Sequence, residues 1–264
     1  MRVLKFGGSS LASADRFLAV ANIIKDQSKT AQVAVVVSAP QGVTNHLVAM
    51  AENISDQAKL QADLGHFKQA IETIIDDLSA TSSKFNRQHC QQVLAHCENQ
   101  LSRYMQGATM LSFCPEHIRA RIISMGERLS VAILSSVLAS KGEAVSELEP
   151  EKFLRTSDDW LNAVADLVLC KETFQKEYSE LNRISLMPGF IGVNCNGEIT
   201  TLGRNGSDYS AAVLAVCTQA ECCEIWTDVD GIYNADPRVI KDATLLDYLS
   251  YQEAMELSYF GASV

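Results

Sequence analysis

Basic residues are scarce in this sequence. The chain of 264 residues has 22 lysines and arginines against 32 aspartates and glutamates, which gives a formal net charge of −10. A polyanion such as nucleic acid, or an anionic membrane, therefore has no extended positive field to follow. We expect neither as a partner, and an anionic substrate would need a local positive pocket.

Long apolar runs and targeting signals are also missing. No stretch of about 18 or more consecutive apolar residues occurs, and the chain does not begin with a basic segment followed by an apolar one. We therefore expect a cytoplasmic protein. Low-complexity segments and internal repeats are absent too, and a content of 47% hydrophobic and 20% charged residues is typical of a globular α/β or α+β protein.

The eight cysteines lack the even spacing of a disulfide framework, and most of them lie inside apolar segments, so reduced thiols are expected. The segment "HCQQVLAHC" repeats a His-Cys pair after seven residues, at His89, Cys90, His96 and Cys97. It could hold a metal ion or could simply pack a helix. Zinc sites usually draw paired ligands from tighter turns, which favours packing, and no metal ligand is predicted.

The pattern of apolar residues predicts strands that alternate with helices around a long helical insertion. The runs "RVLKF" and "QVAVVVSAP" are too continuously apolar for one-faced strands and are typical of a parallel sheet covered on both sides. Asn196-Gly197 predicts a hairpin turn. We expect a three-layer αβα sandwich with a mostly parallel central sheet. The predicted strands are 2–6, 32–40, 144–148, 184–193 and 222–228, and the predicted helices are 13–26, several within 45–140, 207–219 and one near 250–260.

Three glycine-containing turns follow predicted strands, "KFGGSS", "VSAPQGVTN" and "TLGRNGSD". In α/β sheets, ligands bind beyond the carboxyl ends of the strands, where glycines let backbone N–H groups approach a phosphate. Any one of these turns could be an ordinary tight turn, because short glycine motifs are weak alone. Together they indicate one shared anionic site.

The third turn brings charged residues to the start of a helix. Asp208 could be no more than the N-cap of that helix, a position that Ser207 could also take. Arg204 stands beside it, however, and a cation and a carboxylate at such a turn could serve an anionic substrate. Glu127, in "SMGERLS", could equally be an ordinary solvated glutamate.

The segment "EIWTDVDGIYNADPR" places several acidic residues after a predicted strand. Its opening from Asp228 faintly resembles a calcium loop, but the twelfth position of that loop is Val239 and not the required glutamate. A loop that handles a nucleotide fits this segment better.

Seven segments, "KFGGSSLA", "VVVSAPQGVTNHLV", "SMGERLS", "GFIG", "LGRNGSDYSAA", "IWTDVDGIYNADPR" and "EAMELSYFGA", resemble the catalytic domain of aspartate kinases in the amino acid kinase family. They look most like the kinase portion of bifunctional aspartokinase/homoserine dehydrogenases, and they cover essentially the whole chain in the same order. The resemblance implies ATP-dependent phosphorylation of L-aspartate to 4-phospho-L-aspartate, the first step toward lysine, threonine and methionine.

The resemblance assigns roles at the phosphate end of the site. Lys5 would stabilise charge that develops between the β- and γ-phosphates, in a reaction where the protein mainly positions and neutralises. Asp208 would organise Lys5, so these two are the expected catalytic residues. Gly7, Gly8 and Ser9 would contact phosphate.

Further roles follow from the same resemblance. Glu127 would bind the α-ammonium group of aspartate and Arg204 its α-carboxylate, for which a planar fork is suited. Ser38, Thr44 and Ser207 would complete the aspartate site. The nucleotide pocket would be formed by Thr227, Asp228, Tyr233, Asp236 and Arg238. ATP and Mg²⁺ are the implied cosubstrate and ion.

The resemblance also implies a division of the chain and one departure from the family. Residues 1 to about 190 would bind aspartate and residues from about 191 to 264 the nucleotide. Many relatives have a lysine that would contact the nucleotide where this chain has Ser263, so the replacement bears on how tightly ATP binds. The regulatory and dehydrogenase domains of the relatives would lie outside this sequence, which we expect to be a fragment, and the full-length protein is expected to be a homo-oligomer.

Two alternatives remain open. The first is another kinase of the same family that acts on glutamate, acetylglutamate, carbamate or a nucleoside monophosphate. A free amino acid needs partners for both its ammonium and its carboxylate, so Glu127 together with Arg204 favours aspartate. The second is a non-catalytic domain that binds aspartate or nucleotide, against which Lys5 and Asp208 argue.

Overall fold

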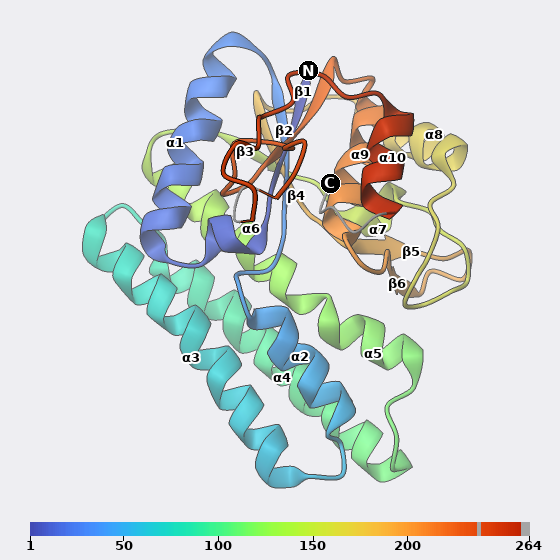
Figure 1. Cartoon of the computed structure of the whole chain (residues 1–264). Helices are drawn as coiled ribbons and strands as arrows, with labels where there is room; N and C mark the ends of the chain where they lie inside the picture. Colours follow the sequence, from blue (N-terminus) through green and yellow to red (C-terminus); the bar gives the residue numbers. More distant parts are fainter. Residues whose placement is uncertain (237–238, 260–264) are drawn as a thin grey trace. The chain divides into compact units, whose positions relative to one another are not determined.

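The computed structural model describes residues 1–236 and 239–259 (Figure 1). The chain divides into two compact units, Met1–Trp226 and Thr227–Val264. Each unit is described by itself. The boundary predicted near residue 190 for aspartate-binding and nucleotide-binding parts concerns function and stays a prediction.

The first unit is built around a five-stranded sheet with the strand order β3-β4-β2-β1-β7. Every neighbouring pair in it is parallel. Parallel strands place their carboxyl ends along one edge, and the glycine-containing turns predicted from the sequence follow β1 and β2 at that edge. The strands are β1 (Arg2–Phe6), β2 (Val33–Val37), β3 (Val145–Glu147), β4 (Ile184–Pro188) and β7 (Cys222–Trp226).

Alternate residues of the central strands enter two separate cores, because successive side chains of a strand point to opposite faces. On β1, Leu4 and Phe6 belong to one buried cluster, while Val3 belongs to the other. All five residues of β2 are buried. The predicted parallel sheet with two covered faces is confirmed.

Helices cover both faces of this sheet (Figure 1). On the face of Leu4 and Phe6 lie α1 (Ala14–Thr30) and α6 (Met125–Ser140), and on the face of Val3 lies α9 (Gly206–Thr218), backed by α7 (Pro150–Phe153) and α8 (Leu167–Glu177). The short 3₁₀ helix η1 (Gly8–Leu11) joins β1 to α1. This is the three-layer arrangement that the sequence predicts.

The helical insertion predicted for residues 45–140 is present and contains further helices beyond the sheet (Figure 1). Within it, α2 (Val43–Glu52) packs against α3 (Gln57–Thr81) and α5 (Glu116–Ile123), and α3 packs against α4 (Arg87–Leu111). Cys90 and Cys97 are buried on α4, whereas His89 and His96 are exposed, so the packing interpretation of "HCQQVLAHC" is confirmed.

One stretch is long and apolar enough to cross a membrane if length and composition alone are considered. It covers Glu116–Ser140, which is α5 and α6 together, with a mean hydropathy of 1.5 over its most apolar window. Of that window, 83% is buried inside the fold. The core helix of a globular protein has the same properties, and here α6 supplies much of the larger core.

The chain leaves the main sheet between β4 and the next strand, although residues 184–193 were expected to be one extended run. Phe190 has a φ of 71°, which turns the chain into a separate antiparallel pair of β5 (Ile191–Val193) and β6 (Ile199–Thr201). Gly197, with a φ of 77°, closes their turn, so the hairpin predicted at Asn196-Gly197 is confirmed.

The second unit has little regular structure in its described residues, 227–236 and 239–259. An isolated bridge joins Tyr233 to Leu245, and the side chain of Asn234 accepts a hydrogen bond from the backbone of Thr244 at 2.9 Å. Its helix is α10 (Tyr251–Tyr259), where the sequence predicts one.

Candidate active site

A cavity of about 350 Å³ lies in the first unit, at the carboxyl ends of β1 and β2 and at the N-terminus of α9. Its walls come from the loop after β2, the first turns of α2 and α6, and the turn before α9. The turns after "TLG" and "VSAP" thus meet at one place, as their glycines suggest. Seven residues predicted for the site line this cavity, and they are Lys5, Gly8, Ser38, Thr44, Glu127, Ser207 and Asp208.

Lys5 and Asp208 form an ion pair inside the cavity. The Lys5 Nζ atom lies 2.7 Å from Asp208 Oδ1, and the side chains are 10% and 38% exposed. Strand alternation turns Lys5 toward the face of the sheet that α9 covers, and Asp208 stands in the first turn of α9. A lysine held in this way keeps its charge in a fixed place, ready for an anionic ligand.

The loop after β2 lies so close to the glycine pair that follows β1 that residue 8 has to be a glycine. A Cβ atom on Gly8 would lie 2.8 Å from the carbonyl oxygen of Ala39. The carbonyl of Gly8 accepts a hydrogen bond from the Gln41 N–H group at 3.1 Å, which ties the two turns together. Residue 8 therefore sets the distance between Lys5 and the wall that carries Ser38.

Glu127 lines the same cavity, but it is buried and is not the solvated glutamate that the sequence leaves open. Its Oε1 atom accepts a hydrogen bond from the Ala39 N–H group at 3.2 Å, whereas its buried Oε2 atom has no hydrogen-bond partner. Burial without a full set of partners raises the pKa of this carboxyl to about 7, although the bonded N–H of Ala39 and the nearby Arg128 act to lower it. A buried carboxyl group that lines a cavity and has an unpaired oxygen suits a cationic ligand group.

Gly126 allows Glu127 to take this position. A Cβ atom at residue 126 would lie 2.5 Å from the Cβ of Ala39 and 3.0 Å from a methyl group of Val43. The N-terminus of α6 can therefore reach the loop after β2 only because residue 126 has no side chain. The contact brings Glu127 to the backbone of Ala39.

Sequence reasoning missed two lining residues, neither of them glycine, whose backbones adopt left-handed conformations. Phe190 has a φ of 71° and Asn205 a φ of 56°, and both line the cavity. Such conformations cost non-glycine residues about 1–3 kcal/mol and cluster at functional sites. The Phe190 N–H group donates to Ser210 Oγ at 2.8 Å, which holds this strained turn. The sequence carries no such signal at Phe190, whereas Asn205 precedes Gly206 and belongs to a residue type that is enriched in this conformation.

Three of the residues predicted to bind phosphate or aspartate do not line the cavity. Gly7 and Ser9 flank Gly8, and a Cβ on Gly7 would lie 3.6 Å from Lys5 Nζ, so the glycine stands directly beside the ammonium group. Arg204 is exposed, between the lining residues Gly203 and Asn205. Its predicted contact with a carboxylate stays a prediction.

The residues predicted for a nucleotide pocket belong to the second unit. Thr227 Oγ1 donates to Asp228 Oδ1 at 3.1 Å, and Tyr233 forms the bridge to Leu245. The carbonyl of Asp236 accepts hydrogen bonds from the backbone of residues 239 and 240. Arg238 and Ser263 lie outside the described residues. The nucleotide pocket as a whole stays a prediction.

Comparison with known proteins gives one consistent result. The model of the amino acid kinase family matches residues 1–264. A bifunctional aspartokinase/homoserine dehydrogenase of Buchnera aphidicola is 44% identical over 265 residues, which cover 100% of this chain and 32% of the relative. The protein of the same description from Haemophilus influenzae is 40% identical over 267 residues, again covering 100% and 32%. This chain thus spans about one third of the length of these two relatives.

A solved structure agrees with these relatives. Aspartokinase III of Escherichia coli, solved in complex with aspartate and ADP, superposes with a TM-score of 0.85 at 30% sequence identity. The match covers 99% of this chain and 57% of that one. The predicted fold is confirmed.

Proposed function

Because this chain belongs to the amino acid kinase family, we propose that it transfers the γ-phosphoryl group of ATP to the side-chain carboxylate of L-aspartate. The product would be 4-phospho-L-aspartate. The relatives named above are aspartokinases, and one was solved with aspartate and ADP. The observation that carries the proposal is one cavity lined both by a buried lysine and by a buried carboxyl group that has an unpaired oxygen.

The carboxylate wall is suited to the amino acid. Glu127 Oε2 has no hydrogen-bond partner, so an α-ammonium group would satisfy a buried oxygen that otherwise lacks one. The hydroxyl-bearing Ser38 and Thr44 line the same cavity and would contact the acceptor or the phosphoryl group. Arg204, exposed beside the cavity, would take the α-carboxylate, where a guanidinium can donate two parallel hydrogen bonds.

The lysine wall is suited to phosphoryl transfer. Charge spreads over the oxygens of the moving phosphoryl group in the transition state, and Lys5 would stabilise it from a position fixed by Asp208. Ser207, at the N-terminus of α9, adds a hydroxyl and the positive end of that helix. The side-chain carboxyl of aspartate is ionised at neutral pH, so the reaction needs no general base.

The oxygen donors of the cavity fit Mg²⁺, which proteins usually bind through one or two carboxylates together with substrate phosphates. Asp208 would provide the protein ligand, since it is the partly exposed carboxylate among the lining residues. When bound, the ion would neutralise phosphate charge. Thr227, Asp228, Tyr233, Asp236 and Arg238 remain the proposed contacts to the nucleotide.

Release of ADP, coupled to a spectroscopic readout, tests this proposal. We expect release that depends on L-aspartate, with L-glutamate and a control without acceptor at the background rate. Equal rates with L-glutamate would indicate another amino acid kinase. Binding of aspartate or ATP without any turnover would indicate the non-catalytic alternative.

A further inference from the structure

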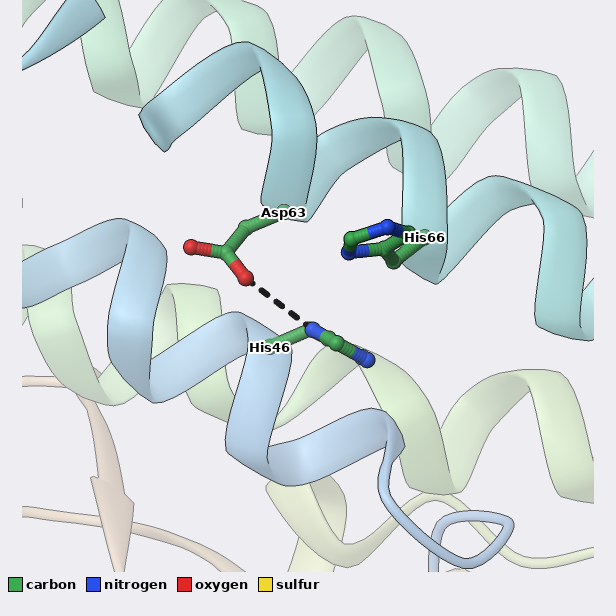
Figure 2. Close-up of side chains that lie close together, drawn as sticks. All are labelled: His46, Asp63 and His66. Carbon is green, nitrogen blue, oxygen red and sulfur yellow. Dashed lines mark hydrogen bonds and ion pairs between the residues drawn. The ribbon is translucent and has the colours of Figure 1, made fainter. Parts of the chain in front are cut away.

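Three potential metal ligands meet between two helices away from the Lys5–Asp208 pair. His46 lies on α2, and Asp63 and His66 lie one turn apart on the facing side of α3 (Figure 2). One ligand atom from each of the three lies within 4.8 Å of the other two. Figure 2 shows the three side chains directed into the space between the helices.

The geometry is close to that of a bound ion. Ligand atoms about 2.0–2.2 Å from a tetrahedral zinc ion lie roughly 3.3 Å apart. His46 Nδ1 and Asp63 Oδ1 are already 3.0 Å apart, and the His46 and His66 rings have their centres 5.3 Å apart. The His66 side chain is exposed, so small rotations of it would shorten the two distances from its ring nitrogen to the other ligand atoms, which are at most 4.8 Å.

The surroundings suit a cation. His46 and His66 open onto a cavity of about 610 Å³, none of whose lining residues is a lysine or arginine among the residues that the structure describes. Lys68, the next cation along α3, is engaged with Glu98 at 3.1 Å. Water could complete the coordination from the polar side of this cavity, which is lined by Gln41, Gln69, Thr73 and Asp77.

We propose that His46, Asp63 and His66 form a binding site for a divalent transition-metal ion of the Zn²⁺ type, which fastens α2 to α3. Two imidazoles and one carboxylate are the ligand set that zinc and its neighbours accept, with water in the remaining position. In the absence of an ion, the hydrogen bond between His46 and Asp63 keeps two of the ligands together.

The ion would act on the candidate active site through α2. Thr44 and Asn45 in the first turn of α2 line that site, and His46 follows them directly. Pro40 and Gln41 line both cavities. An ion that fixes His46 against α3 would therefore restrain the wall that carries Thr44.

Calorimetric titration of the metal-free protein with Zn²⁺ tests the site, independently of any kinase activity. One equivalent should bind and raise the melting temperature. The His66→Gln variant should weaken this binding by more than about 100-fold, since even partners of metal ligands contribute tenfold to 100-fold. His46→Gln should do the same. His89→Gln, which changes an exposed histidine on α4, should bind as the wild type does.

Titration with Co²⁺ separates this site from the exposed thiols of Cys195 and Cys223. Histidine and carboxylate ligands should give visible bands without the near-ultraviolet absorption of a cobalt–thiolate bond. A thiolate band at one equivalent would overturn the proposal. So would unchanged Zn²⁺ affinity in both His66→Gln and His46→Gln, or no Zn²⁺ binding at all.

Discussion

The ammonium group of Lys5 lies 2.7 Å from Asp208 Oδ1, although one residue stands near the start of the chain on β1 and the other opens α9. The Lys5 side chain is only 10% exposed, so Asp208 is what holds its charge in place within the cavity. The two residues should therefore act as a unit in catalysis.

Replacing Lys5 by methionine should lower kcat by about 100-fold or more and should change the KM for aspartate little. The lysine contact strengthens as charge develops on the phosphoryl group, and losing one such fixed donor costs a factor of this order. Steady-state kinetics with both substrates would measure it. Lys25→Met serves as the control and should retain kcat. Lys25 lies in the C-terminal half of α1 and forms an ion pair with Glu143.

Combining Lys5→Met with Asp208→Asn should lower kcat by clearly less than the product of the two single-variant factors. Once the lysine is gone, Asp208 has no ammonium to hold, and residues that act as a unit give strongly non-additive losses. The double-mutant cycle for kcat would show this. Fully multiplicative losses would mean that Asp208 acts only as a ligand of Mg²⁺ and contributes nothing through Lys5.

The value of kcat/KM for aspartate should fall as the pH drops below about 7. Burial raises the pKa of Glu127 to about 7, so acid neutralises the carboxylate that the substrate ammonium needs. In Glu127→Gln this acidic limb should disappear, and KM should rise by about tenfold or more, because a charge-assisted hydrogen bond is lost. A wild-type profile that is flat from pH 6 to 8 would contradict the role of Glu127.

Glu127 should also make the ligand-free protein less stable as the pH rises. Its pKa is raised from 4.5 to about 7 by folding, so its contribution is most favourable below pH 4.5 and is lost as the pH passes through 7. The shift corresponds to about 3 kcal/mol at most. Urea unfolding at pH 5 and pH 8 should show that Glu127→Gln loses less stability than the wild type over this interval. Saturating aspartate should reduce the difference.

Gly126→Ala should destabilise the protein by about 1–3 kcal/mol and raise the KM for aspartate. The new Cβ would lie 2.5 Å from the Cβ of Ala39, and overpacking of this kind usually costs that much. Moving the loop would also disturb the Ala39 N–H group that holds Glu127. Gly107→Ala on α4 is the matched control, since nothing lies within 4 Å of its added Cβ. It should leave both quantities unchanged or increase stability slightly.

The sequence predicted those parts of the sheet and of the cavity lining that depend on local apolar patterns and on the turns that follow strands. Continuous apolar runs predicted β1 and β2, the glycine turns predicted one shared anionic site, and the family resemblance implied that Asp208 organises Lys5. It could not predict contacts made between distant segments, such as Gly126 against Ala39. Phe190 was missed because its left-handed turn depends on a hydrogen bond to Ser210.

The metal ligands were missed for a similar reason. They come from two helices, and neither His46 on α2 nor Asp63 and His66 on α3 forms a close-spaced motif that crosses between them. The repeated His-Cys pairs of α4 looked more like a motif. There the helix turns the cysteines inward and the histidines outward.

Arg204→Lys should raise the KM for aspartate while kcat changes less. A lysine keeps the charge but cannot donate two parallel hydrogen bonds to the α-carboxylate. Arg204 is exposed in the ligand-free structure, so its contact would form when the substrate binds. An unchanged KM in a variant that unfolds at the wild-type urea concentration would remove Arg204 from the substrate site.

Trapping of the acyl phosphate tests most directly whether L-aspartate receives a phosphoryl group beside Lys5. The protein is incubated with ATP, Mg²⁺, L-aspartate and hydroxylamine, and the aspartyl hydroxamate formed is measured for the wild type and for Lys5→Met. We expect hydroxamate that depends on both ATP and L-aspartate in the wild type, and about 1% or less of that rate in Lys5→Met. No hydroxamate from the wild type, or an equal rate in Lys5→Met, would contradict it.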